Sequence, residues 1–179
     1  MPEIEIRPAV LADFGRLVSL EHFYQTPYVW QMDRISEEGA VTVNFREVRL
    51  PRPVRVEYPH SPEKLVENWK TLSEMLVAFM KGEQVGYVAL KEQSVPRALW
   101  VVDLVVGEKN RRKGIGSALV LAAQEWAAEH NLRRVIIEMQ SKNYPAIKMA
   151  LKLGYEFCGY NDHYYANQDI ALFFAGFLR

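Results

Sequence analysis

The sequence is poor in the features that define several classes of protein. It has one cysteine, Cys158, so the chain can form neither an internal disulfide nor a cysteine zinc site. No apolar run approaches the roughly 18 residues of a membrane-spanning helix. The 22 basic and 22 acidic residues cancel, whereas nucleic-acid binders and polybasic membrane binders carry a basic surplus. We therefore expect no nucleic-acid or membrane partner, and any anion site must be a local cluster.

The composition of the 179 residues indicates one folded domain, residues 1–179. Of these, 49% are hydrophobic and 25% are charged, ordinary values for a globular protein with a core. The segment Met1–Arg7 is acidic and alternating, unlike a signal peptide, so we expect a cytoplasmic protein. We expect no metal, because metal-ligand spacing is absent among the four histidines, His22, His60, His130 and His163.

Hydrophobic periodicity predicts alternating strands and helices. Residues 24–39 lack a clear period and predict a mobile loop or a short helix, whereas Leu11, Phe14 and Leu17 share the expected buried face of the first helix. The order predicts an α/β or α+β fold, in which a mixed sheet carries helices on both faces. Strands are expected over residues 4–7, 41–48, 54–58, 74–80, 85–90, 99–106, 135–139, 155–160 and 169–178, and helices over residues 11–18, 61–72, 114–129 and 145–153.

A basic, glycine-containing turn follows the apolar strand at residues 99–106. Arg111, Arg112 and Lys113 stand before Gly114 and Gly116, where a helix begins. The first N–H groups of a helix are unpaired and its dipole attracts anions. Glycines let a phosphate approach the backbone without meeting a Cβ atom. We therefore expect a phosphate-binding turn here, although the phosphate-loop and dinucleotide patterns are both absent.

Two motifs resemble those of the GCN5-related N-acetyltransferases. The pattern R-x-x-G-x-G at residues 111–116 is similar to the pyrophosphate signature of that family. About thirty residues later a second family motif is in register with Asn143, Ala146, Gly154 and Tyr155.

The resemblance covers most of the chain. The first strand and helix and the hairpin at residues 80–90 also match, which leaves residues 24–72 as a variable segment on the acceptor side. Within the family, Asp103, residues 159–165 and residues 169–174 are most similar to the streptothricin-acetyltransferase branch.

The resemblance implies a mixed, mostly antiparallel sheet in which two central parallel strands splay apart and hold acetyl-CoA. The edge of the first strand would pair with the pantetheine arm, and one of its N–H groups would polarise the thioester carbonyl. The turn would hold the pyrophosphate. The residues expected to bind acetyl-CoA are Leu104, Val105, Val106, Arg111, Arg112, Lys113, Gly114, Ile115, Gly116, Ser117, Asn143 and Ala146.

The resemblance also implies that the acceptor amine attacks the thioester directly, without an acyl-enzyme, and this fits the lack of a nucleophile signature in the sequence. Asp103 lies in an otherwise apolar strand, where a charge is costly unless it is paired or functional. It is therefore our first candidate for the base that deprotonates the amine. Glu138, at the end of the other splayed strand, is the second candidate.

The acid that protonates the leaving thiolate is less clearly marked. The family's usual acid is a tyrosine seven positions after the asparagine that matches Asn143, and here that position is Ala150. We favour Tyr164 and Tyr165 as its substitutes.

The predicted enzyme is an acetyl-CoA-dependent N-acetyltransferase that acts on a primary amine of a small molecule, such as an aminoglycoside-like or streptothricin-like antibiotic. Aromatic residues and carboxylates interleave over residues 24–60, which suits a cationic acceptor. Three alternatives stay open: a protein or peptide amine as the acceptor, a longer acyl-CoA as the donor, and a non-catalytic acyl-CoA-binding module, for which Ala150 is the only hint. The exposed final strands are compatible with a homodimer formed by edge pairing.

Overall fold

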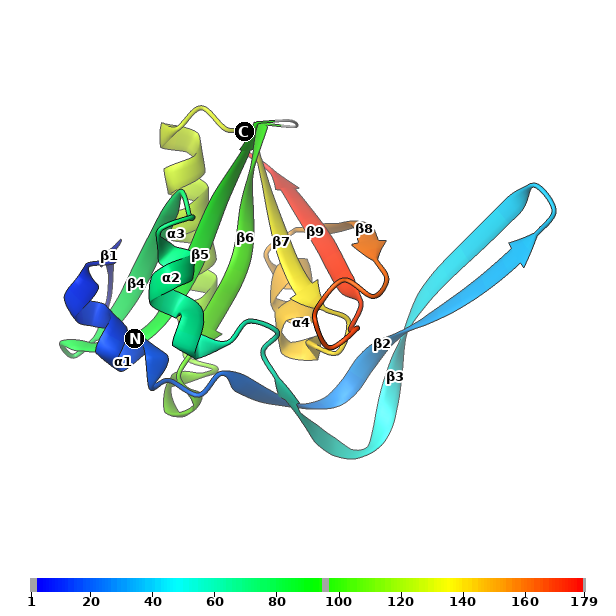
Figure 1. Ribbon diagram of the computed structural model, residues 1–179, viewed down its shortest axis with the longest axis horizontal. Coiled ribbons are helices and arrows are strands. Elements are labelled where there is room, and N and C mark those ends of the chain that lie inside the picture. The colour runs from blue at the N-terminus through cyan, green and yellow to red at the C-terminus, as the bar shows by residue number, and fades with distance from the viewer. Residues whose placement is uncertain (1–2, 95–96, 179) are drawn as a thin grey trace.

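The computed structural model describes residues 3–94 and 97–178, and its main feature is a seven-stranded sheet. All neighbouring strands are antiparallel except β6 and β7, which are parallel. The sheet twists through the molecule as Figure 1 shows. Its strands, in spatial order, are β1 (Ile4–Pro8), β4 (Glu74–Met80), β5 (Glu83–Ser94), β6 (Arg97–Val106), β7 (Arg134–Gln140), β9 (Ala171–Phe177) and β8 (Glu156–Asn161).

Helices cover both faces of this sheet. Alternate side chains of the strands enter two separate cores, because successive residues of a strand point to opposite faces. One core contains Phe14 and Leu17 of α1 and Leu65 of α2, and the other contains Leu119 of α3 and Ile147 of α4. The predicted fold class is therefore confirmed. The helices are η1 (Leu11–Asp13), α1 (Phe14–Val18), η2 (Pro62–Lys64), α2 (Leu65–Trp69), η3 (Glu108–Asn110), α3 (Ile115–Glu129) and α4 (Tyr144–Lys152).

The parallel pair β6–β7 separates after only three residue pairs, of which Val101 with Ile137 is the last. At the same point β6 bulges against β5: Leu90 pairs with Val101 but Ala89 pairs with Asp103, so Val102 is the extra residue. A bulge bends the strand that carries it and increases its twist. β6 therefore turns away while β7 stays paired with β9 through Gln140, and the two strands diverge as predicted (Figure 1).

The largest difference from the sequence prediction is a two-stranded ribbon, β2 (Phe23–Glu37) with β3 (Ala40–Glu57). Residues 23–37 form a strand and residues 38 and 39 its turn, where a loop or short helix was expected, and the strands expected over residues 41–48 and 54–58 form one strand, β3. The far part of the ribbon projects from the body (Figure 1), so both faces of β2 meet solvent there and no apolar alternation marks that strand. The prolines Pro51 and Pro53 lie where the pairing register breaks, because they lack the N–H group that a ladder needs.

The short helices also differ in detail from the prediction. The expected helix over residues 61–72 is only η2 and α2. Leu11, expected on a buried face, is 66% exposed, because it belongs to the 3-10 turn η1, which has a tighter repeat than the α-helix that follows. None of the described helices has both the length and the apolar character needed to cross a membrane.

The buried carboxylate of Asp13, in η1, links this turn to β1 and to the start of β5. Asp13 accepts hydrogen bonds from both terminal nitrogens of Arg7 at 2.8 and 2.9 Å, from the Val10 N–H at 2.9 Å and from Gln84 at 3.0 Å. The Arg7 guanidinium, helped by the Val10 and Gln84 donors, holds the pKa of Asp13 at about 2. Because this lies below the value in the unfolded chain, Asp13 stabilises the fold above pH 4 and loses that contribution as the pH falls from about 4 to 2.

We predict that Asp13→Asn lowers the free energy of unfolding by about 2 kcal/mol at pH 7, the amount that corresponds to the lowered pKa. The matched control is Asp33→Asn, which breaks an exposed ion pair with Arg46 on the ribbon and should cost less than about 1 kcal/mol. Urea unfolding at pH 7 and pH 3 measures both. Equal effects of the two substitutions, or a pH-independent effect at Asp13, would contradict this account.

Candidate active site

The turn between β6 and α3 presents a run of free backbone N–H groups. Within the described residues, none of the six N–H groups from Arg112 to Ser117 donates a hydrogen bond, and the first bond of α3 runs from Ala118 to Gly114 at 2.9 Å. Arg112 and Gly114 both have positive φ angles, 64° and 84°. Successive N–H groups in such a left-handed turn form a concave anion-binding site at the positive end of a helix.

The basic side chains of this turn have different roles. Arg111 donates from Nε to the Val106 carbonyl at 2.8 Å and from Nη2 to the Glu21 carbonyl at 2.9 Å, so it holds the turn against the end of β6. Arg112 and Lys113 are exposed and available to an anion. Ile115 is buried in the core between the sheet and α3, which leaves only its N–H group for binding, and Ser117 lies half-buried in the first turn of α3.

The two glycines of the turn are needed for different reasons. A Cβ atom on Gly114 would meet nothing within 4 Å, but its φ of 84° disfavours any other residue. A Cβ atom on Gly116 would lie 3.2 Å from Met149 Sδ and 4.0 Å from Leu104 Cδ2. The missing side chain of Gly116 therefore also leaves room for Met149 of α4 and Leu104 of β6, and its role toward a phosphate stays a prediction.

The segment of β6 expected to pair with pantetheine, residues 104–106, offers backbone groups rather than side chains to a ligand. Val105 is buried in the core beneath α1 and α2, and Leu104 and Val106 pack on the other core. The edge of β6 that faces β7 has no strand partner among the described residues beyond Val101, so it offers its backbone groups to an extended ligand.

The second family motif forms the start of α4, at the end of β7. Asn143 caps this helix, and its Oδ1 accepts the Ala146 N–H at 3.2 Å. Ala150, at the position of the family's tyrosine, is fully buried in the core and faces no ligand.

The structure brings the four residues predicted for catalysis to one side of the opening between β6 and β7. Glu138 directly follows the last residue pair, Val101 with Ile137, and Asp103 follows it after the bulge residue Val102. Glu138 lies between Ile137 and Met139 and Asp103 precedes Leu104, all three of which pack on the α3/α4 core, so both carboxylates lie on the opposite face. The Tyr164 hydroxyl donates to Glu138 Oε2 at 3.3 Å, and the rings of Tyr164 and Tyr165 lie 5.0 Å apart. Burial raises the pKa of Glu138, while His60 and the two tyrosines oppose this shift.

His60 is the one site residue that sequence reasoning missed. It lies in the linker between β3 and η2, and its Nδ1 is 2.8 Å from Asp103 Oδ1. Its ring stands nearly perpendicular to that of Tyr165, with centroids 6.1 Å apart. The contact with Asp103 joins residues 43 positions apart, and the only sequence signal was that His60 belongs to the variable segment expected on the acceptor side.

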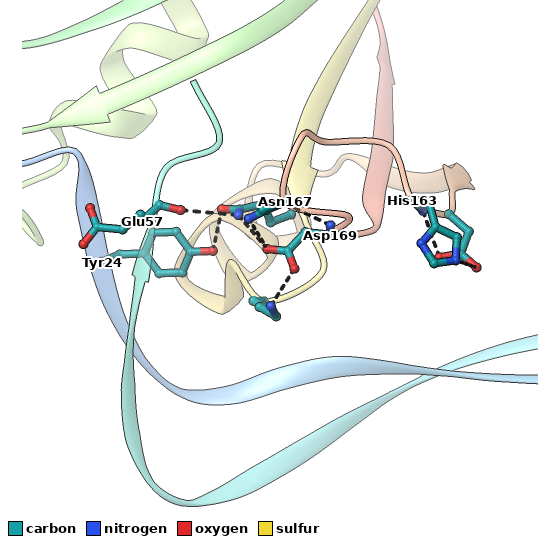
Figure 2. Close-up of polar contacts among 8 residues, drawn as sticks. Tyr24, Glu57, His163, Asn167 and Asp169 are labelled. Carbon is teal, nitrogen blue, oxygen red and sulfur yellow. Dashed lines mark hydrogen bonds and ion pairs between the residues drawn. The ribbon is translucent and has the colours of Figure 1, made fainter. Parts of the chain in front are cut away.

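The loop that carries the two tyrosines, residues 162–170, is fixed by the carboxylate of Asp169 (Figure 2). Asp169 accepts hydrogen bonds from Gln140 at 2.9 Å, from Lys142 at 2.5 Å and from Asn167 at 3.0 Å. Gln140 in turn accepts the Tyr24 hydroxyl at 2.9 Å. The loop is thereby tied to the end of β7 and to the base of β2.

Other reactive side chains lie outside this constellation. His163 has a 70% exposed side chain and lies apart from the Asp169 network in Figure 2. Cys158 is exposed on β8, two strands away from β7. No cluster of three or more His, Cys, Asp or Glu side chains that could hold a metal ion occurs in residues 3–94 and 97–178.

Comparison with known sequences gives one family and several relatives. The model of the Acetyltransferase (GNAT) family matches residues 43–155. The streptothricin acetyltransferase of Streptomyces lavendulae is 26% identical over 166 residues, which cover 90% of this chain and 86% of that protein. An N-alpha-acetyltransferase of Sulfurisphaera tokodaii is 34% identical over 116 residues, which cover 55% of this chain and 66%, just under two thirds, of that protein.

Comparison with solved structures supports the fold. A streptothricin acetyltransferase assigned in Bacillus anthracis, solved in complex with acetyl coenzyme A, superposes with a TM-score of 0.78 at 20% identity and covers 99% of both chains. At this identity the likeness shows that the two chains share a fold.

We predict that Gly114→Ala weakens the binding of CoA and acetyl-CoA by about tenfold or more, because alanine disfavours the positive φ that aligns the N–H groups of the turn. Gly39→Ala is the matched control. Gly39 also has a positive φ, 75°, with open space at its Cβ position, but it lies in the ribbon turn. Calorimetric titration measures both affinities. Equal affinities for CoA in the two variants would remove the turn from the binding site.

Proposed function

The chain belongs to the acetyltransferase (GNAT) family, and from this premise we propose that it transfers the acetyl group of acetyl-CoA to a primary amine of a small molecule. The acceptor class we propose is a cationic antibiotic of the streptothricin or aminoglycoside type. The match to a streptothricin acetyltransferase over 90% of the chain supports this class.

The observation that carries the proposal is the pair of carboxylates at the point where β6 and β7 separate. Glu138 forms no ion pair with a described residue, and its hydrogen-bond donor there is the hydroxyl of Tyr164. A carboxylate beside aromatic rings suits an ammonium group, through charge and through contact with the ring faces. The fixed loop that carries the tyrosines favours a small acceptor over an extended chain.

The other side of the opening fits acetyl-CoA. The free N–H groups from Arg112 to Ser117 would hold the diphosphate, and Arg112 and Lys113 would add positive charge. The unpaired edge of Leu104–Val106 would align the pantetheine arm, beside the start of α4 at Asn143 and Ala146. The thioester then supplies an activated acyl group.

In this proposal the amine attacks the thioester directly. Cys158, the single cysteine of the sequence, lies on β8, two strands away from β7, so we expect no acyl-enzyme on a cysteine. The acceptor must lose a proton before it attacks, and the basic groups at that point are Glu138 and the Asp103–His60 pair. Burial, helped by the charge of Glu138, raises the pKa of Tyr165, so this hydroxyl keeps its proton and can stabilise the leaving thiolate by donating a hydrogen bond to it.

A protein α-amine is the second candidate acceptor. It is supported by the relative named N-alpha-acetyltransferase, which is 34% identical over its matched part. An open acceptor side would be required for this function, because a peptide must pass through the site as an extended chain.

The proposal is tested with purified protein, acetyl-CoA and three acceptor sets: streptothricins, aminoglycosides, and peptides with free N-termini or lysines. Release of CoA and the mass of the product are followed together. We expect turnover of at least one small-molecule set with an added acetyl group on nitrogen. Turnover of peptides alone would establish the second candidate, and binding of CoA without any turnover would support a non-catalytic module.

We predict that Glu138→Gln raises the KM for the amine about tenfold or more while the affinity for acetyl-CoA is unchanged, because the amide removes the charge that attracts the ammonium group. Glu156→Gln, on the exposed edge strand β8, is the control and should leave both values at the wild-type level. Steady-state kinetics and calorimetry measure the two quantities. A wild-type KM in the Glu138 variant would show that this carboxylate does not contact the acceptor.

A further inference from the structure

The most informative contact outside the predicted set is the hydrogen bond between His60 and Asp103. The Nδ1 and Oδ1 atoms are 2.8 Å apart, and the side chains are 40% and 15% exposed. The carboxylate is therefore the more buried partner, and the imidazole ring is the more exposed one. Because a carboxylate oxygen accepts, Nδ1 carries the hydrogen, and Nε2 of the neutral ring keeps a free lone pair. Nε2 bonds to none of the described residues.

The ring of His60 is held from several sides. Its linker is fixed by the Tyr58 N–H, which donates to the His22 carbonyl at 2.9 Å. The Tyr58 ring packs edge-on against Tyr24, with centroids 5.5 Å apart. Asp103 fixes one nitrogen, and the Tyr165 ring borders the imidazole. Contacts of this kind set the direction in which Nε2 points, as a base in a defined position requires.

The other histidine near this linker is not available for proton transfer. His22 is buried, and both its ring nitrogens are occupied, Nδ1 by the Leu20 carbonyl at 2.7 Å and Nε2 by the Tyr87 hydroxyl at 3.0 Å. Burial lowers the pKa of His22, whereas the Asp103 hydrogen bond raises the pKa of His60. The two histidines therefore have different chemistry although they come from adjacent segments.

Asp103 itself is less suited to direct contact with the acceptor than its sequence position implies. Its Oδ1 is engaged by His60, and it is the more buried of the two side chains. The pair therefore leaves His60 Nε2 as its more exposed basic atom, and Asp103 holds the other nitrogen of the ring.

We propose that His60 Nε2 accepts the proton of the acceptor ammonium group, and that Asp103 is a positioning residue that holds His60 through Nδ1. This inference rests on the function proposed above. The N–H bond of the ammonium breaks and its electron pair stays on nitrogen. The neutral amine then attacks the thioester carbonyl carbon, the C–N bond forms and the C–S bond breaks. The second amine proton leaves with the CoA thiol, and His60 returns its proton to water.

The pH dependence follows from the groups that face His60. These are Asp103 on β6, Glu138 on β7 and Tyr165 in the loop at residues 162–170. The hydrogen bond that His60 donates to Asp103 is the largest cause that raises the pKa of His60; burial lowers it, and the charges of Asp103 and Glu138 raise it further. Since the neutral ring is the active form, kcat/KM must rise with pH through the pKa of His60.

The test compares wild type, His60→Gln, Asp103→Asn and the control His163→Gln, which removes an exposed loop histidine by the same substitution. We measure kcat/KM between pH 5.5 and 9.5, acetyl-CoA affinity, and the titration of the histidine rings by NMR. His60→Gln should lower kcat about 100-fold, the scale of general base catalysis, and abolish the acidic limb while acetyl-CoA affinity is kept. His163→Gln should match wild type.

Asp103→Asn separates positioning from mere structural support. It should move the acidic limb and the NMR titration of His60 together to lower pH, because the main cause of the raised pKa is removed, and it should lower the plateau rate. This variant also keeps the proposal testable if His60→Gln fails to fold.

Each remaining outcome counts against one claim. A wild-type rate and pH limb in folded His60→Gln would overturn the role of His60 but leave acetyl transfer intact. A lower rate in Asp103→Asn without a shift of the limb or of the His60 titration would overturn the positioning role. No turnover of any acceptor by the wild-type protein would instead overturn the proposed function.

Discussion

The short pairing between β6 and β7 is the constraint on which the rest of the site depends. The two central strands share three residue pairs and then separate where β6 bulges at Val102. The bulge leaves one edge of β6 unpaired. An extended ligand could pair with this edge in the middle of a sheet whose other neighbouring strands are hydrogen-bonded to each other. The bulge also places Asp103 and Glu138 one or two residues beyond the last pair. One backbone irregularity thus supplies both the unpaired edge and the carboxylates on which the proposed function depends.

The two sides of the opening use different chemistry because different parts of the chain build them. Backbone N–H groups at the start of α3 dominate one side, and such groups bind anions without a buried charge. Side chains dominate the other: carboxylates from the strands, His60 from the linker after β3, and tyrosines from the loop that Asp169 fixes. The variable segment is therefore part of the acceptor side as well as a projecting ribbon.

The sequence predicted the sheet, α3 and α4 well, because these elements bury one or both faces and so carry strong periodicity. It failed for β2, where the ribbon is exposed on both sides and pairing between the strands rather than burial defines the structure, and it divided β3 into two strands. The turn before α3 was predictable as a helix start because its residues are contiguous. The contact of His60 with Asp103 was not, because it joins distant segments without a motif, and the packing of Gly116 on Met149 depends on a helix contact that periodicity does not report.

The most direct test of the account is amide hydrogen exchange with and without CoA. The N–H groups from Arg112 to Ser117 are free in the described structure and should exchange rapidly; CoA should protect them together with the edge of Leu104–Val106. The ribbon tip at residues 33–44 should exchange at the same rate in both states. Protection in both segments would place CoA in the opening between β6 and β7. Unchanged exchange at residues 112–117 while CoA is bound would contradict the central claim.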